Sequence, residues 1–465
     1  MSEFFLFLYL SVWILLVTFG IHRYYLTFLY HTVKRKSPEL KKKFVHLPEV
    51  TVQLPVYNEM YVVKRLVQAA CSIDYPGHLL EIQVLDDSTD ETSAIAKEEV
   101  EKFKKKRVNI KYVHRNKRTG FKAGALKEGM EKAEGEFFAI FDADFIPHPA
   151  IFTKALHHFT DPEVGMVQVR WEHINKNYSV LTRIQSLLLD GHFVIEHTAR
   201  SRSGRFFNFN GTAGIWRKKC IESAGGWHAD TLTEDLDLSY RAQLKGWKFV
   251  YLMDEVSSAE LPVEMSAFKN QQFRWAKGSI QTAKKILPGL IRSRLPLKLK
   301  IEAIAHLTGN TAYLCLFLLS LLIYPLMAVK SNLSWLAMRT IYISLLFIGT
   351  GAVSFFYLYA QKEINPSWKS TILYLPVLMS LGIGISVNNT RAVLEGLFGY
   401  NSAFKRTPKY HIESKEDTWK GKKYFEVMGF ITFFELLLGI YFFFTVLLAF
   451  KRGIFISVPF LFIFL

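Results

Sequence analysis

Cysteine is scarce in this chain: Cys71, Cys220 and Cys315 are the three cysteines among 465 residues. They are scattered, and none has the spacing of a zinc site or a redox motif, which excludes a disulfide framework and a cysteine-based metal centre. The sequence also lacks internal repeats and low-complexity linkers. These absences fit a protein of a reducing compartment whose chemistry comes from other residues.

A cleavable leader is also not expected. Residues 4–20 carry no charge, and aromatic residues continue to Tyr30, so the run is about as long as a short membrane-spanning helix requires. No positively charged region precedes it and no small-residue cleavage site follows it. We therefore expect residues 1–31 to form a retained N-terminal transmembrane anchor.

The hydrophobic residues, half of the chain, are unevenly distributed. Residues 45–285 have ordinary charge and predict a globular domain, whereas residues 286–465 predict a C-terminal membrane domain. The apolar segments in this second part are about 313–329, 337–360, 370–388, 427–449 and 453–465.

The excess of basic residues, a formal charge of +17, is concentrated beside the apolar segments, at 34–43, 284–300 and 405–423. This is the positive-inside pattern, with a contribution from anionic lipid headgroups. It predicts a multi-pass protein of the plasma membrane or an inner membrane, with a cytoplasmic globular domain. We expect this domain to contact membrane lipids and to bind no nucleic acid. A merely solvated basic surface is the alternative, but it would not follow the membrane boundaries.

The number of membrane crossings conflicts with this charge pattern. If segments 313–329, 337–360 and 370–388 all spanned, the basic stretch 402–423 would fall outside. The segment 370–388 carries Pro376, Gly382 and Gly384 and leads into Asn388 and Asn389. We therefore expect it to be interfacial or re-entrant. Segment 453–465 is short for a span.

Strand and helix patterns alternate in the first part of the globular domain. Strand-like runs occupy 50–55, 81–85, 110–113 and 137–141, and helical patterns occupy 61–72, 89–105 and 124–133. A mainly parallel sheet with covered faces is expected, with ligands bound outside the carboxyl ends of its strands. A strand at 164–171, a long helical stretch that contains 183–197 and a strand at 247–252 follow.

Four polar motifs occur in a fixed order. They are Asp86-Asp87, Asp142-Ala143-Asp144, Thr233-Glu234-Asp235 and Gln271-Gln272-Phe273-Arg274-Trp275. The first two follow strands, so they converge on one edge of the sheet. Asp142 and Asp144 can approach one Mg²⁺ or Mn²⁺ together with diphosphate oxygens. A solvated turn is the alternative for this pair.

Other side chains near the first motif suit a nucleotide. Asp86 and Asp87 can accept hydrogen bonds from the N–H groups of a base or ribose, and Tyr57 and Glu59 lie at the preceding strand end. Lys122 can reach a phosphate as a point charge, although a surface lysine is the alternative.

Asp235 is the candidate general base, because a displacement by a hydroxyl needs a carboxylate to take its proton. A capping carboxylate is the alternative, which suits Glu234 or Asp237 as well. We expect Thr231 or Thr233 to cap the helix that begins there, placing Glu234 and Asp235 at its positive end.

Gln271, Arg274 and Trp275 are spaced i, i+3 and i+4, so they share one face of a helix. An amide, a guanidinium and an indole on one face suit phosphate contact and sugar stacking. The alternative is an ordinary Trp and Arg pair at a membrane interface.

Together these motifs resemble the processive, membrane-embedded members of glycosyltransferase family 2, such as cellulose, hyaluronan and plant mannan or glucan synthases. The likeness to plant mannan and xyloglucan-backbone synthases is greatest at residues 53–59, 83–90, 122–126, 210–214 and 246–252. The resemblance implies an α/β GT-A (Rossmann-like) domain inserted between transmembrane helices, a nucleotide-sugar donor, Mg²⁺ or Mn²⁺, and inversion to a β-linkage.

The positions in the family motifs imply that Asp86 or Asp87 binds the nucleobase. They also imply that Asp144, with Asp142, binds the metal and the diphosphate, and that Asp235 is the general base with Glu234 beside it. Trp275 stacks on the acceptor sugar, and we assign Asn210, Gly211 and Thr212 to the acceptor with it.

Residues 404–409, Phe-Lys-Arg-Thr-Pro-Lys, resemble the gating loop of these synthases within the basic segment 402–423. Arg406 stands where that loop usually has Val, which bears on how the loop inserts. Thr407 and Lys409 can still touch a diphosphate. A basic juxtamembrane loop is the alternative.

Three functions follow. The first is transfer of a hexosyl residue from a UDP- or GDP-hexose to a growing β-glycan, coupled to export through the membrane helices or to export and assembly partners. The second is transfer of one sugar to a lipid acceptor, as in ceramide glucosyltransferases. The third is a membrane scaffold with an inactive transferase domain, which the presence of Asp144, Asp235 and Trp275 disfavours.

Overall fold

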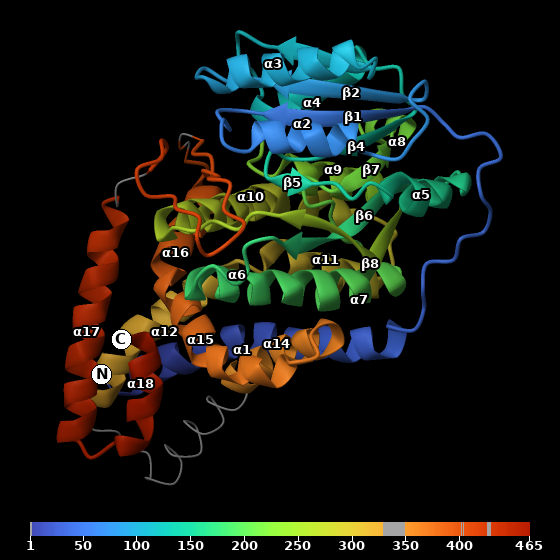
Figure 1. The fold of residues 1–465 in the computed structure, drawn as a ribbon. Coiled ribbons are helices and arrows are strands. Elements are labelled where there is room, and N and C mark those ends of the chain that lie inside the picture. Colours follow the sequence, from blue (N-terminus) through green and yellow to red (C-terminus); the bar gives the residue numbers. More distant parts are fainter. Residues whose placement is uncertain (1, 329–348, 401, 403, 426–428) are drawn as a thin grey trace.

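The computed structural model describes residues 2–328, 349–400, 402, 404–425 and 429–465. A domain built on a β-sheet lies above a group of helices that come from both ends of the chain (Figure 1). The segment after α1 (Ser2–Val33) runs along one side of the domain up to the first strand.

The sheet is mixed, and its eight strands among the described residues follow the order β3-β2-β1-β4-β7-β6-β8-β5. β1 pairs in parallel with β2 and β4, and β2 with β3. β7 runs antiparallel to both β4 and β6. We predicted a mainly parallel sheet and did not predict β7. The strands are β1 (Val50–Val56), β2 (Leu80–Asp86), β3 (Ile110–His114), β4 (Phe137–Ile140), β5 (Phe145–Ile146), β6 (Val164–His173), β7 (Gly214–Arg217) and β8 (Lys248–Ala259).

The central strands are almost entirely buried, as expected of parallel strands covered on both faces. Pro55 lies within β1 although proline cannot donate a ladder hydrogen bond. The position tolerates it because the pairing of β1 with β4 ends at Gln53. The helices of this domain are α2 (Val63–Cys71), α3 (Thr92–Lys105), α4 (Phe121–Glu131), α5 (Ile151–Ala155), η1 (Leu156–Thr160), α8 (Lys218–Ser223), α9 (Glu234–Leu244) and α10 (Met265–Arg292).

Two hydrophobic clusters cover the sheet. One includes Leu66 of α2 and Val100 of α3, and the other includes Leu126 of α4 and Leu238 of α9. The long helical stretch predicted around 183–197 is divided into α6 (Val180–Asp190), a π-helical turn η2 (Gly191–His197) and α7 (Thr198–Arg202). These helices form the floor of the domain (Figure 1).

A third cluster joins this floor to the helices below it. Leu26 and Tyr30 of α1 pack with Ile184 and Leu187 of α6 and with Phe356 of α14 (Gly351–Ile364). Figure 1 shows α1 and α14 beneath α6 and α7. The globular domain is thus packed directly on apolar helices.

Within the described residues, three helices are long and apolar enough to cross a membrane: Glu3–Val33 within α1, α12 (Thr311–Ala328) and α17 (Ile431–Lys451). The first half of the predicted segment 337–360 lies outside the described residues. The last apolar segment contains η5 (Phe455–Ser457) and the short helix α18 (Val458–Phe464). α11 (Leu297–Thr308) connects α10 to α12.

The segment 370–388 is bent. It comprises η4 (Trp368–Tyr374) and α15 (Leu375–Gly384), and the chain then turns by 42° into α16 (Ser386–Phe398). Such a pair is either a broken span or a re-entrant loop, and our expectation of a non-spanning segment stays a prediction. α16 is tied to α10, because Lys277 pairs with Glu395 at 2.8 Å.

Candidate active site

A cavity of about 460 Å³ opens at the carboxyl ends of β1 and β4. Segments far apart in the sequence converge on it, including the start of α9, one face of α10 and residues 404–409. Of the predicted site residues, the cavity is lined by Tyr57, Glu59, Asp87, Lys122, Asp142, Asp144, Asn210, Gly211, Glu234, Asp235, Gln271, Arg274, Trp275, Thr407 and Lys409.

Two predicted residues do not line the cavity. Thr212 is fully buried, and its Oγ1 accepts a hydrogen bond from the backbone N–H of Asp142 at 2.9 Å. It therefore positions Asp142 instead of facing an acceptor. Asp86 is also fully buried and accepts hydrogen bonds from Ser88 N–H at 3.0 Å and from Tyr112 OH at 2.6 Å. Burial raises the pKa of Asp86, but the hydrogen bonds outweigh it and hold that pKa below its usual value.

Asp142 and Asp144 each meet an ammonium group. Lys122 Nζ donates to Asp142 and, at 2.8 Å, to the carbonyl of Gly211. Lys409 Nζ donates to Asp144 Oδ2 at 2.7 Å. Burial raises the pKa of Asp142, and the charge of Lys122 opposes that rise. Two adjacent carboxylates that gather positive charge are a donor set that fits Mg²⁺ or Mn²⁺.

Asp235 lies in the first turn of α9, beside Gly211. Burial raises its pKa to about 7, with the charge of Glu234 adding to the effect and Lys122 opposing it. Gly211 has φ +81°, and a Cβ there would lie 3.1 Å from Asp235 Oδ2. Glycine therefore leaves the carboxylate of Asp235 open to the cavity. A carboxylate that titrates near neutral pH suits a general base.

The segment that holds Asp235 is braced by α10. Gln281 Oε1 accepts a hydrogen bond from Leu232 N–H at 2.9 Å, and Thr282 Oγ1 lies 3.2 Å from Thr233 Oγ1. A Cβ at Gly278 would lie 2.5 Å from Thr233 Cγ2, so these segments touch closely. Thr233 is the residue before α9 but its side chain makes no capping hydrogen bond, so that prediction was wrong. Its hydroxyl faces α10 instead.

Asp87 and Tyr57, which we predicted to bind the nucleobase, contact arginines that sequence reasoning missed. Arg115 donates to both carboxylate oxygens of Asp87, at 2.7 and 2.6 Å. The guanidinium of Arg118 lies 3.4 Å from the centre of the Tyr57 ring. Neither arginine stands near Asp87 in the sequence; β3 brings both to this edge.

The loop 404–409 lies within the cavity. Phe404 stacks on Phe121 with ring centroids 5.5 Å apart, and Arg274 Nη2 donates to Thr407 Oγ1 at 2.8 Å. Arg406 forms an ion pair with Glu59 at 2.9 Å. Burial raises the pKa of Glu59 to about 7 in spite of this pair. The arginine that departs from the family pattern thus has an acidic partner in the cavity wall.

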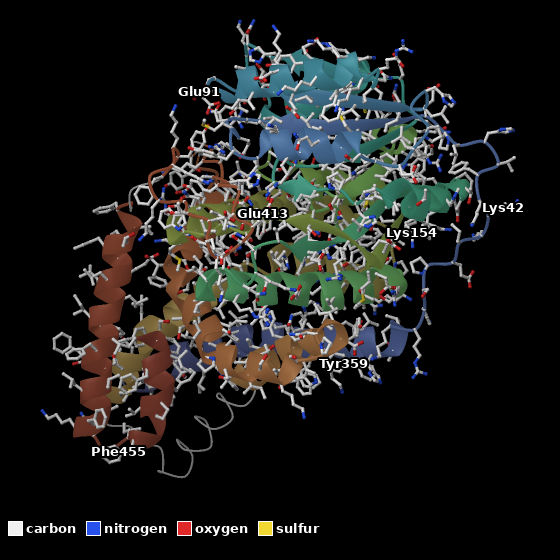
Figure 2. All side chains as sticks on the ribbon, in the orientation of Figure 1. Lys42, Glu91, Lys154, Tyr359, Glu413 and Phe455 are labelled. Carbon is white, nitrogen blue, oxygen red and sulfur yellow. The ribbon has the colours of Figure 1, made fainter. Side chains whose placement is uncertain are left out.

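The chain beyond Lys409 folds back over the domain. Figure 2 labels Glu413 on this segment. Its carboxylate accepts a hydrogen bond from Arg65 Nη1 of α2 at 2.8 Å, and Arg65 also pairs with Glu260 at 3.3 Å. The position of the loop therefore depends on contacts outside the cavity as well as within it.

Residues 48–278 match the family described as "Glycosyltransferase like family 2". These residues form a glycosyltransferase family 2 domain. The chain is similar to "Probable glucomannan 4-beta-mannosyltransferase 7" of Oryza sativa subsp. japonica, at 47% identity over 244 residues, covering 51% of this chain and 42% of that protein. It is also similar to "Glucomannan 4-beta-mannosyltransferase 2" of Arabidopsis thaliana, at 41% identity over 275 residues, covering 56% of this chain and 52% of that protein. The chain spans about half the length of these relatives.

The fold also resembles a solved structure, "Mannosyltransferase PcManGT from Pyrobaculum calidifontis in complex with GDP-Man and Mn2+". The TM-score is 0.57 at 19% identity, and the match covers 84% of this chain and 100% of that one. The glycosyltransferase domain therefore has the predicted GT-A fold.

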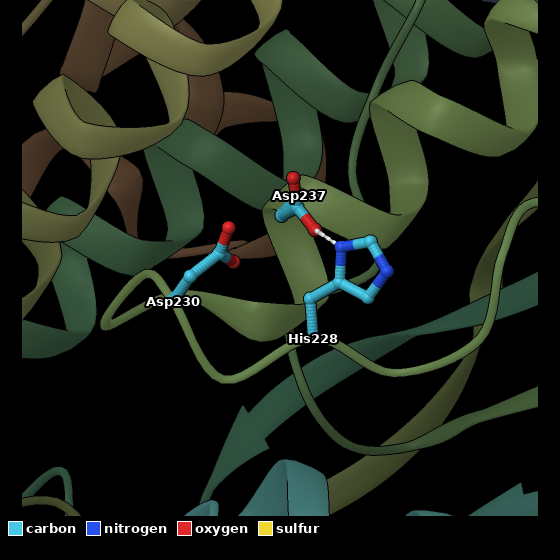
Figure 3. Close-up of side chains that lie close together, drawn as sticks. All are labelled: His228, Asp230 and Asp237. Atoms are coloured by element: carbon cyan, nitrogen blue, oxygen red, sulfur yellow. Dashed lines mark ion pairs between the residues drawn. The ribbon is translucent and has the colours of Figure 1, made fainter.

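A second acidic cluster of the glycosyltransferase domain adjoins the cavity: Asp230 lines the cavity, whereas His228 and Asp237 do not. Figure 3 shows His228, Asp230 and Asp237 close together. Their ligand atoms lie within 4.8 Å of one another, as in a metal site. However, Lys285 Nζ lies 3.0 Å from His228 Nδ1, 2.8 Å from Asp230 and 3.0 Å from Asp237. The ammonium group supplies the positive charge that a metal would bring. Asp237 is fully buried in this cluster, so it is not an alternative base.

Proposed function

We propose that this protein is an inverting hexosyltransferase that extends a β-glycan from a nucleoside-diphosphate hexose at the cytoplasmic face of a membrane. The observation that carries the proposal is the meeting of Asp235 with Asp142 and Asp144 in one cavity lined by Gln271, Arg274 and Trp275. The similarity to glucomannan mannosyltransferases supports a hexose as the transferred group.

The donor end of the cavity is rich in positive charge. Lys122, Arg274 and Lys409 all line it and suit the phosphates of the donor. Asp144 and Asp142 would hold Mg²⁺ or Mn²⁺, which when bound neutralises charge on the departing diphosphate. The Mn²⁺ of the solved mannosyltransferase with GDP-Man is consistent with this assignment. We assign the wall formed by Asp87, Arg118 and Tyr57 to the nucleobase, with Arg115 holding Asp87 in place.

The transfer step needs one proton acceptor. A hydroxyl oxygen of the acceptor attacks the anomeric carbon while the bond to the diphosphate oxygen breaks, and the hydroxyl proton passes to a carboxylate oxygen of Asp235. Attack from the side opposite to the leaving group inverts the anomeric configuration. The pKa of Asp235, raised to about 7 by burial and by Glu234, keeps the carboxylate basic enough to accept the proton.

The acceptor would lie between Trp275 and Asn210, on the side of the cavity that adjoins α10 and η2. A pyranose offers C–H groups to an indole face and hydroxyls to an amide. Because the domain packs on helices able to span a membrane, we propose that the product leaves along these helices, alone or with assembly partners.

Incorporation of labelled sugar by the purified protein in lipid tests the proposal. UDP-glucose, UDP-N-acetylglucosamine and GDP-mannose would be supplied separately with Mn²⁺, and products would be separated by size. We expect one donor to label a polymer that a β-glycan hydrolase degrades. Label in a lipid fraction with one sugar per lipid would instead favour a ceramide-glucosyltransferase-like activity, and no transfer from any donor would contradict the proposal.

A further inference from the structure

Two side chains at the end of β6 belong to the cavity wall but have no place in the mechanism above. Trp171 and His173 are two residues apart on the strand, so they point to the same face of the sheet. Both line the cavity, together with Phe145, which follows Asp144. In the described arrangement, Nε1 of Trp171 and Nδ1 of His173 are themselves buried.

The ring of His173 is oriented by a buried carboxylate. His173 is only 5% exposed, and its Nε2 lies 3.3 Å from Asp190 Oδ1. The other oxygen of Asp190 accepts a hydrogen bond from Gln361 at 2.7 Å. Burial raises the pKa of Asp190, but His173 and Gln361 outweigh it and hold that pKa below its usual value. An ionised carboxylate only accepts, so the proton lies on Nε2 and Nδ1 presents a lone pair.

Nδ1 of His173 finds no hydrogen-bond partner in the part of the chain that the structure describes. The same is true of Nε1 of Trp171. The indole ring itself is well packed, with centroids 5.1 Å from Phe145 and 5.0 Å from Phe193. The indole ring is therefore packed against aromatic neighbours, whereas its N–H group has no hydrogen-bond acceptor among the described residues.

Lack of a partner alone does not distinguish these residues. Within the described ranges, Nε1 of Trp216 and of Trp227 is also unpaired, but neither residue lines the cavity. Trp171 and His173 combine both properties, as Arg118 and Thr231 also do, and they place one donor and one acceptor two residues apart on one strand. Buried polar groups without partners are costly, so such a pair at a binding site is expected to be satisfied by the ligand.

We propose that Trp171 Nε1–H and His173 Nδ1 form a subsite that reads hydroxyl groups of a hexose in the transfer reaction. A hydroxyl both donates and accepts, so neighbouring hydroxyls of one pyranose can satisfy the two groups. A phosphate cannot, since its oxygens would meet the lone pair of His173, and a lipid chain would leave both groups unpaired. The inference rests on the proposed function and adds the residues that select the sugar.

The loop 404–409 reaches this subsite through Lys409. His173 pairs with Ala259 across the sheet, and the carbonyl of the next residue, Glu260, accepts a hydrogen bond from Lys409 Nζ. Lys409 therefore lies beside the subsite while it contacts Asp144.

Substrates that lack single hydroxyls test the proposal. The kcat/KM of transfer is compared for the preferred hexose donor, its monodeoxy analogues, and monodeoxy oligosaccharide acceptors. We expect wild-type protein to lose about tenfold on one analogue, the worth of one hydrogen bond. His173→Phe or Trp171→Phe should lose a similar factor with the parent sugar but show no further loss on that analogue. His173→Gln, which keeps an acceptor atom, should restore part of the discrimination.

Trp216→Phe is the matched control, because it removes an equally buried, unpaired indole N–H away from the cavity. It should keep the full discrimination. A coupled hydroxyl on a donor analogue assigns the subsite to the donor sugar, and one on an acceptor analogue assigns it to the acceptor. Equal discrimination in wild type, His173→Phe and Trp171→Phe would overturn the inference and leave the proposed function standing. Wild-type protein that transfers no hexose would overturn both.

Discussion

Lys409 donates a hydrogen bond to Asp144 at 2.7 Å, so an ammonium group from the loop contacts the carboxylate that we assign to a divalent cation. Asp142 is engaged by Lys122 in the same way. Lys409 of the loop and a bound divalent cation would therefore compete for the carboxylate of Asp144. A ligand that binds one arrangement better than the other shifts the population between them.

Lys409→Ala should tighten binding of Mn²⁺ to the nucleotide-free protein, because the competing cation is gone. The same change should lower turnover, since Lys409 is expected to contact the diphosphate when the site is filled. Titration of Mn²⁺ followed by electron paramagnetic resonance measures the first effect and steady-state transfer the second. Lys415→Ala, an exposed lysine of the same segment, is the control. Unchanged Mn²⁺ affinity in Lys409→Ala would argue against competition.

Asp144→Ala should weaken binding of a nucleoside diphosphate in the presence of Mn²⁺ and have little effect in its absence. The reason is that the carboxylate acts through the cation and not by direct contact with the phosphates, which it would repel. Calorimetric titration with and without a chelator measures the difference. Full transfer activity of wild type in excess chelator would contradict the metal assignment.

Transfer should rise with pH through a pKa near 7 and then level off, because only the ionised form of Asp235 accepts the proton. Glu234→Gln removes a neighbouring negative charge that raises this pKa. The midpoint of the kcat/KM profile should therefore move to lower pH. Glu222→Gln, an exposed position on α8, should leave the midpoint in place. An unmoved or raised midpoint in Glu234→Gln would show that another group controls the profile.

Lys285→Ala should destabilise the protein by about 2 kcal/mol, because the buried Asp237 loses one of its two cationic partners. The effect is measured as a lower melting temperature, with Lys298→Ala of α11 as an exposed control.

Wild-type protein should bind no transition metal at His228 and Asp230, since the ammonium group of Lys285 lies between the ligand atoms. Metal binding there that survives Asp144→Ala would refute this interpretation.

Much of the site was predictable because strand ends and helix faces follow from local patterns. The aspartates after β2 and β4 and the i, i+3, i+4 spacing on α10 placed most of the predicted residues correctly in one cavity. The mixed sheet was not predictable in the same way, since β7 is four residues long and its antiparallel pairing is set by contacts distant in sequence.

The errors have a common physical origin. Asp86 and Asp87 are adjacent, but successive residues at a strand end point in opposite directions, so Asp86 turns into the protein while Asp87 lines the cavity. Thr212 follows two cavity residues and is buried for a similar reason. Partners such as Arg115, Arg118 and His173 were missed because each reaches the site from a segment with no motif of its own.

The central claim is that Asp235 is the base of a hexosyl transfer. It is tested most directly by measuring label incorporation from the preferred nucleotide hexose by wild type and Asp235→Asn in lipid, with nucleoside-diphosphate affinity measured on the same samples. The variant should lose about 10²–10⁴-fold in transfer while its affinity stays close to that of wild type. Near-normal transfer by Asp235→Asn would contradict the account.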